Sequence, residues 1–88
     1  MGKFIYFTSV EKRQANEVDL PSFLRDRGEK LIMAGREYRL ASDHSITVRG
    51  AKWFDHATRR GGGAIGFVMA FYDKTYPEAV TMLLGRDG

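Results

Sequence analysis

The stretch Trp53–Phe71, WFDHATRRGGGAIGFVMAF, decides the fold of this chain. It runs from two aromatic residues through a polar turn and three glycines into an apolar segment. The pattern predicts a strand over Lys52–His56, a glycine turn at Gly61–Gly63 that ends the sheet, and a helix over Ala64–Tyr72. Because this helix is apolar on nearly all sides, we expect it to be buried.

The residues that precede Trp53 predict the rest of a small antiparallel sheet. Short strands are expected at Lys30–Met33, Glu37–Leu40 and Ser45–Arg49, with turns at Ala34-Gly35 and Gly50-Ala51. A sheet of three to four such short strands is not stable alone, so helices must pack against one of its faces.

Helix-start signals occur twice in the N-terminal part. The TSVE sequence at Thr8–Glu11 is a capping box, in which a hydroxyl and a carboxylate three residues later satisfy free backbone N–H groups. It predicts a helix ending near Asn16. Asp19 can cap a second helix, which we expect to end at Gly28. Before them, Lys3–Phe7 is a short β-favouring run.

A second capping box, TYPE at Thr75–Glu78, predicts a last helix that ends at Gly85. The expected fold class is therefore α+β, a small antiparallel sheet flanked by N-terminal helices and two C-terminal helices. We expect a core that includes a ring cluster. Its predicted members are Leu24, Tyr38, Ile46, Val48, Trp53, Phe67, Phe71 and Leu83.

Length and composition limit what the chain can be. Its 88 residues are enough for one domain, expected to have its core at about residues 18–85 and to be a piece of a larger protein. Without cysteine, disulfides and thiolate metal sites are excluded. No apolar run approaches the roughly 18 residues needed to span a bilayer, so we expect a cytoplasmic protein with no membrane partner.

Positive charge is concentrated in the middle of the chain. The net charge is +3, but residues 30–60 alone carry seven Lys or Arg and three Asp or Glu, a net +4. A basic centre between nearly neutral flanks indicates a surface for a polyanion. A solvated sheet face without a ligand is the alternative.

The RRGGGAI segment, which begins at Arg59, suggests phosphate binding. Glycines let a backbone approach closely, and the N-terminus of the following helix offers N–H groups and a positive dipole end. The alternative is an ordinary tight turn in which glycine supplies a positive φ. No GK[ST] sequence follows, so it is not a Walker loop.

Aromatic residues alternate with basic ones in the predicted sheet, a pattern suited to single-stranded nucleic acid because bases stack on rings while cations contact phosphates. Strand alternation places one of Trp53 and Phe54 inward and the other outward, and Phe54 is the stacking candidate. The predicted nucleic-acid-binding residues are Arg36, Arg39, Arg49, Lys52, Phe54, Arg59, Arg60, Gly61 and Gly62.

The acidic and histidine residues do not form a recognisable catalytic or metal pattern. Asp43, His44, Asp55 and His56 lack the spacing of a zinc knuckle and lie in predicted turns. No carboxylate pair or Ser/His/Asp arrangement with a supporting signature is present. We therefore expect no enzyme activity in this chain, no cofactor and no metal.

Several segments, in order, resemble the zinc-ribbon domain that begins bacterial DnaG-type DNA primases: VDLPSFLRDRG, AGREYRL, DHSITV, KWFDHATRRGGGAIGFVMAF and TYPEAVTMLLG. The resemblance covers about residues 18–85 and is most specific in the C-terminal part. The first zinc knuckle is deleted, and Asp55 and Thr58 stand where the second has cysteines. In this the chain resembles a cysteine-free branch, a domain of unknown function that precedes Toprim domains in proteins of bacterial plasmids and conjugative elements. Gly66 departs from that pattern, which has Asp there.

This resemblance implies a degenerate, zinc-free primase module. Its expected role is non-catalytic binding of nucleic acid, single-stranded DNA in particular, beside a Toprim domain of a protein that acts in DNA replication. The alternative is a structural module that packs against the Toprim domain and does not bind DNA.

Overall fold

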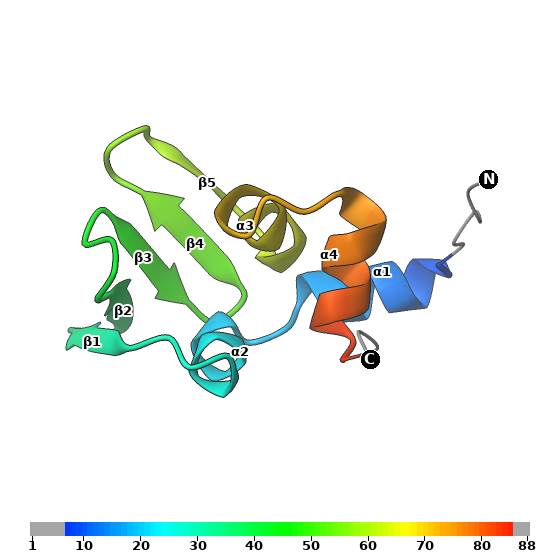
Figure 1. Ribbon diagram of the computed structural model, residues 1–88, viewed down its shortest axis with the longest axis horizontal. Helices are drawn as coiled ribbons and strands as arrows, with labels where there is room; N and C mark the ends of the chain where they lie inside the picture. The colour runs from blue at the N-terminus through cyan, green and yellow to red at the C-terminus, as the bar shows by residue number, and fades with distance from the viewer. Residues whose placement is uncertain (1–6, 86–88) are drawn as a thin grey trace.

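The computed structural model describes residues 7–85, which form four helices and a five-stranded antiparallel sheet (Figure 1). The predicted α+β fold class is confirmed, with two helices before the sheet and two after it. The strand predicted at Lys3–Phe7 falls on residues 1–6, outside the described ones. The elements are α1 Ser9–Asn16, α2 Leu20–Asp26, β1 Leu31–Ala34, β2 Glu37–Leu40, β3 Ile46–Arg49, β4 Lys52–Asp55, β5 Arg60–Gly62, α3 Ala64–Phe71 and α4 Tyr76–Leu83.

The predicted helix caps are present. In α1, the hydroxyl of Thr8 accepts the backbone N–H of Glu11 at 3.0 Å, and the Glu11 carboxylate accepts the N–H of Thr8 at 2.9 Å. Asp19 accepts the N–H of Ser22 at the start of α2. These contacts satisfy N–H groups that have no partner within the helix, which is why the helices begin where the sequence predicts.

The cap of α4 also lowers the pKa of a carboxyl group. The backbone N–H of Thr75 and its hydroxyl both donate to the Glu78 carboxylate. These two hydrogen bonds, the backbone one most strongly, hold the pKa of the Glu78 carboxyl below its usual value. A carboxyl whose pKa is lower in the folded chain stabilises the fold above its unfolded-state pKa. This stabilisation is lost as the pH falls through the folded-state pKa.

The sheet is a simple meander, β1-β2-β3-β4-β5, in which every strand pairs with its neighbour in the sequence. The first turn lies at Gly35-Arg36, one residue later than predicted, because Gly35 takes the positive φ of 66°.

The sheet has a fifth strand, β5, where the sequence predicted only a turn that ends the sheet. Glycine usually interrupts strands, and this rule misled the prediction. At Gly61 a Cβ would lie 2.6 Å from the carbonyl oxygen of Trp53 and 3.0 Å from Cδ1 of Phe54. Glycine at this position therefore permits the close pairing of β5 with β4.

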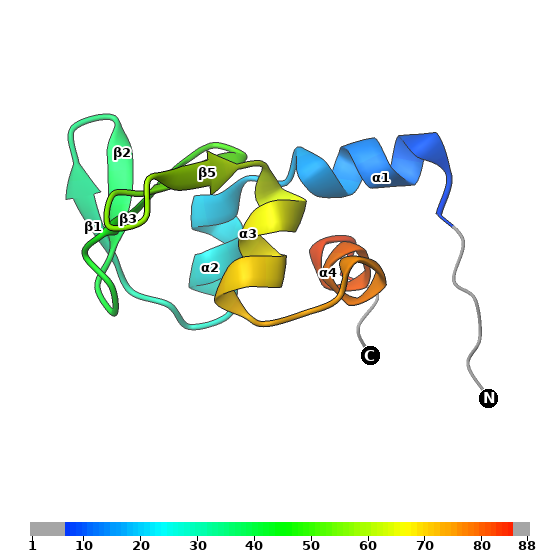
Figure 2. The same ribbon diagram turned by 90° about the horizontal axis from the view of Figure 1, so that it is seen from above.

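Both helices next to the sheet pack against the same face. Trp53 and Val48 share this face, and α2 contacts β3 while α3 contacts β4 and β5. Figure 2 shows α2 and α3 side by side on one side of the sheet, with α1 and α4 at the end remote from β1 and β2.

The core is more aliphatic than predicted. Phe67 is its one fully buried aromatic side chain among residues 7–85, packed against Trp53 (ring centroids 5.8 Å apart) and Phe71 (5.1 Å). The prediction that Tyr38, Trp53 and Phe71 are core is only partly correct, because they are half-buried at the edge of the helical layer. The buried hydrophobic residues are Ala15, Leu20, Leu24, Leu40, Ile46, Val48, Ala64, Ile65, Phe67, Val68, Ala79, Val80, Met82 and Leu83.

Burial of Ala15 extends the core beyond the predicted limit at residue 18, so α1 is part of the domain. Asn16, at the end of α1, connects it to the start of α3. Its Oδ1 accepts the backbone N–H of Ile65 at 3.1 Å. At Gly63, the N-cap residue of α3, a Cβ would lie 2.5 Å from the same oxygen. A glycine is thus required for Asn16 to reach the helix.

Replacing Asn16 by alanine is expected to destabilise the domain by about 1–2 kcal/mol, because a partly buried backbone N–H of α3 loses its acceptor. Thermal or urea unfolding followed by circular dichroism measures the change. Gln14→Ala, an exposed position on the same helix, is the control and should stay within about 0.5 kcal/mol of the parent. Equal effects of the two substitutions would mean that the Asn16 contact contributes nothing.

Among residues 7–85, no helix has both the length and the apolar character that crossing a bilayer requires.

Candidate nucleic-acid interface

The face of the sheet opposite α2 and α3 is not covered by any element of residues 7–85, and we call it the open face. Paired residues of antiparallel strands lie on the same face, and residues two apart on one strand do as well. One row of pairs across the open face is Arg39, Thr47, Phe54 and Gly61. The face is formed by Ile32, Ala34, Glu37, Arg39, Thr47, Arg49, Lys52, Phe54 and Gly61.

Three cations of the open face, Arg39, Arg49 and Lys52, are exposed. Arg49 and Lys52 are directly opposite each other on β3 and β4, and Arg39 lies one row away on β2. Glu37 is on the same face and offsets part of this charge. The open face therefore has a net positive charge.

Phe54 is the exposed aromatic residue at the centre of this arrangement. Its side chain is 39% exposed, whereas Trp53 packs against the core on the other face. The prediction that one of the two rings points inward is confirmed, and Phe54 is the outward one. Its ring packs edge-to-face with His56 at 4.8 Å and beside Gly61, which has no side chain. A flat aromatic surface is thus exposed next to the cations.

Beneath Phe54 and His56 lies the buried Thr47. Its hydroxyl lies 3.4 Å from Nε2 of His56 and 3.5 Å from the carbonyl oxygen of Phe54. These contacts hold the His56 ring against the sheet, and His56 in turn packs against the Phe54 ring.

The other predicted binding residues are elsewhere. Arg36 is in the β1–β2 turn, and Arg59 is in the β4–β5 turn with an unusual φ of 59°. Arg60 pairs with Asp55, so its side chain lies on the α3 side of the sheet, and Gly62, which pairs with Trp53, faces the same way. The structure brings together five of the nine predicted residues on one face: Arg39, Arg49, Lys52, Phe54 and Gly61.

The start of α3, where the sequence suggested a phosphate site, is occupied from within the protein. Asn16 accepts the N–H of Ile65 and lies against Gly63. Because 49 residues separate Asn16 from Ile65, the local sequence could not reveal this cap. The N-terminus of α3 thus has an internal partner for one of the N–H groups that a phosphate would use.

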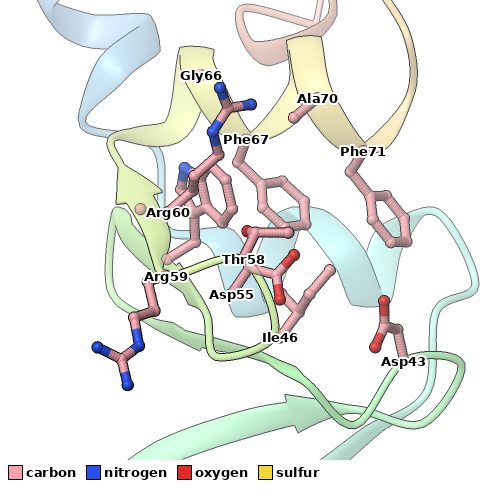
Figure 3. A pocket seen from close by; sticks show the side chains of 12 residues that line it. Asp43, Ile46, Asp55, Thr58, Arg59, Arg60, Gly66, Phe67, Ala70 and Phe71 are labelled. Atoms are coloured by element: carbon pink, nitrogen blue, oxygen red, sulfur yellow. The ribbon is translucent and has the colours of Figure 1, made fainter.

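A pocket of about 740 Å³ lies between α3 and the β4–β5 hairpin (Figure 3). Its polar lining comes from Asp43, Asp55, Thr58, Arg59 and Arg60, and its apolar wall from Ile46, Trp53, Phe67, Ala70 and Phe71. The sequence indicated Asp43 and Asp55 only as turn residues, and both do hold turns. Oδ1 of Asp43 accepts the N–H of Ser45, and Oδ1 of Asp55 accepts that of Ala57.

Within residues 7–85, no three His, Asp or Glu side chains come close enough together to hold a metal ion. His44 and Asp43 are near the β2–β3 connection, whereas His56 contacts the open face.

Comparison with known proteins finds no protein-family model, no curated protein and no solved structure that matches this chain.

Proposed function

We propose that this domain is a non-catalytic module that binds single-stranded DNA. The observation that carries the proposal is the exposed Phe54 ring on a sheet face that also presents Arg39, Arg49 and Lys52. Single-strand-binding surfaces combine these two features, since bases stack on an aromatic ring without sequence preference and cations follow the phosphates.

The dimensions of the sheet support this use. Neighbouring strands are about 4.8 Å apart, so Arg39, two strands from Phe54, lies about 10 Å from it. This distance is about one Debye length at 0.1 M ionic strength. A base stacked on Phe54 would thus have its flanking phosphates within range of the cations. Gly61, which pairs with Phe54 on β5, adds no side chain on that side of the ring.

The resemblance of residues 18–85 to primase zinc-ribbon domains supports DNA as the nucleic acid. It also supports a place beside a Toprim domain, in a cytoplasmic replication protein of a plasmid or conjugative element. In this role the module would hold the template strand near a catalytic domain, and packing of its core would stabilise it without zinc.

Salt dependence tests the proposal. Contacts to three or four phosphates of a single strand predict a log–log slope of affinity against salt of about −2 to −3. Fluorescence anisotropy with a labelled oligothymidylate of about 12 nucleotides, a length within the site sizes of known single-strand-binding domains, measures this slope. Binding that does not respond to salt, or no binding at low salt, would contradict the proposal.

A protein-docking role is the second candidate, and one observation favours it. The edge strand β1 exposes Met33 (70% exposed) and Ile32 (45%), and an exposed apolar edge strand is a common docking surface. If docking is the function, Met33→Lys should weaken association with a Toprim domain while charge reversal on the open face changes nothing.

A further inference from the structure

The pocket beside α3 has features of a built ligand site that the open face does not explain. Its volume of about 740 Å³ is in the range of small-molecule sites, which are about 300–1,000 Å³. The half-buried rings of Trp53 and Phe71 form part of its wall, together with the ring of Phe67. Figure 3 shows Phe67 and Phe71 side by side along α3. Such a wall suits a planar ring.

The indole N–H of Trp53 is the most informative group. Its nitrogen is buried and has no hydrogen-bond partner among residues 7–85. A Cβ at Gly62 would lie 3.6 Å from this nitrogen, and one at Gly66 would lie 3.9 Å from it. The two glycines therefore place no side chain against the donor. The nitrogen itself has no accessible surface, so the ring must shift slightly for a ligand to accept from it. A buried donor without an acceptor costs free energy unless something accepts from it, so the pocket favours a ligand that carries an acceptor.

Two carboxylates of the pocket can accept hydrogen bonds from a ligand. Asp43 and Asp55 each use Oδ1 to hold a turn, which fixes the carboxylate and leaves Oδ2 able to accept from a ligand. A carboxylate oxygen can accept more than one hydrogen bond, so Oδ2 can accept from neighbouring N–H groups. The ligand should thus carry N–H donors as well as an acceptor.

The charges at the rim of the pocket favour a nucleotide over a lysine side chain. Arg59 and Arg60 lie beside the pocket on the β4–β5 hairpin, and Figure 3 shows the Arg60 side chain directed toward Gly66. A lysine side chain of a peptide would match the carboxylates, but it would meet two arginines and leave the indole N–H without an acceptor. A nucleotide matches all the groups, since its base has ring, donors and acceptors and its phosphate suits arginine.

We propose that this pocket receives one nucleotide unit of the bound strand, and that it prefers guanine. This inference rests on the proposed function. The N1–H and N2–H groups of guanine are adjacent donors for a carboxylate, and O6 and N7 are acceptors for the indole. The strand would pass from Phe54 on the open face across β5 into the pocket. The crossing is possible because Gly61 and Gly62 place no side chain at this edge of the sheet.

Mononucleotides test the pocket directly. Titration of the labelled domain with dGMP should shift the NMR signals of the Trp53 indole N–H and the amides of residues 55–60 and 66–71. The same concentrations of dAMP, dCMP and TMP should shift them less. Absence of shifts at these positions with every nucleotide would overturn the proposal. So would larger shifts with acetyl-lysine amide, which would indicate a peptide site.

Substitutions at Gly66 provide a matched pair. Gly66→Leu places a side chain at the pocket mouth and should weaken dGMP binding about tenfold, a loss equivalent to about 1.4 kcal/mol. Gly66→Ala adds only a Cβ at ordinary contact distance and should stay within about twofold of the parent. Ala70→Leu, one helical turn along α3, blocks the same pocket and serves if Gly66→Leu does not fold.

Oligonucleotides separate this inference from the proposed function. If a strand with one guanine binds and shifts the open-face signals but not the pocket signals, the pocket proposal is wrong and the proposed function stands. If dGMP shifts the pocket signals but no oligonucleotide binds, the pocket is a nucleotide site and the proposed function is wrong. If Gly66→Leu weakens the binding of guanine-containing strands but not of strands without guanine, the result supports both the pocket proposal and the proposed function.

Discussion

Replacing Phe67 by alanine is expected to lower the free energy of unfolding by about 3–5 kcal/mol, the usual cost of removing a buried phenylalanine ring. Phe67 is 1% exposed and lies between Trp53 and Phe71, so the cavity cannot fill without movement of both neighbouring rings. Native proteins are stable by only about 5–15 kcal/mol, and a domain of this size should lie near the lower end, so the substitution should remove much of the stability. Urea unfolding followed by circular dichroism measures the loss.

Phe54→Ala is the matched control, since it removes the same ring from the open face. Phe54 is 39% exposed and its loss should cost about 1 kcal/mol or less. Trp53→Ala should lie between the two, because its ring is half-buried. If Phe67→Ala and Phe54→Ala were equally stable, the ring of Phe67 would not be the centre of the core.

Reversing the three open-face charges, with Arg39→Glu, Arg49→Glu and Lys52→Glu together, is expected to weaken single-stranded DNA binding by about 100-fold at 0.1 M salt. Each single-strand phosphate contact contributes about 0.7 to the salt slope, so three contacts account for about two decades of affinity between 1 M and 0.1 M salt. Fluorescence anisotropy measures the affinity, and circular dichroism checks that the variant is folded.

The control must change the charge equally at a different place. Lys12→Glu, Arg13→Glu and Lys74→Glu are exposed substitutions outside the sheet, and both triple variants take the net charge from +3 to −3. If the control loses as much affinity as the open-face variant, binding depends on total charge and not on this surface. If neither triple variant loses affinity, the result supports the protein-docking role.

Local signals in the sequence were sufficient for most of the fold. The capping boxes at Thr8 and Thr75 and the cap at Asp19 predicted where three helices begin. Strand alternation predicted that Trp53 and Phe54 face opposite ways. These features depend on residues within a few positions of each other, and short-range hydrogen bonds and side-chain alternation determine them.

What the sequence did not reveal depends on contacts between distant residues. Asn16 caps α3 from another helix, and Gly61 is a strand residue only because Phe54 and Trp53 approach it so closely. The position of Arg60 on the α3 side follows from the register of β5, a strand that was not predicted. The pocket at Asp43 and Asp55 likewise forms only when two turns and a helix come together.

The order of the strands has a consequence for how the domain folds. Each strand pairs with the one that follows it in the chain, so every ladder closes a loop of only a few residues. Short loops lose little entropy on closing, and chains rich in local pairing reach their native state quickly. We expect the late event to be the meeting of α1 with α3 and α4, which joins the two ends of the described chain. A newly synthesised copy should thus form its strand meander before the helical layer is complete.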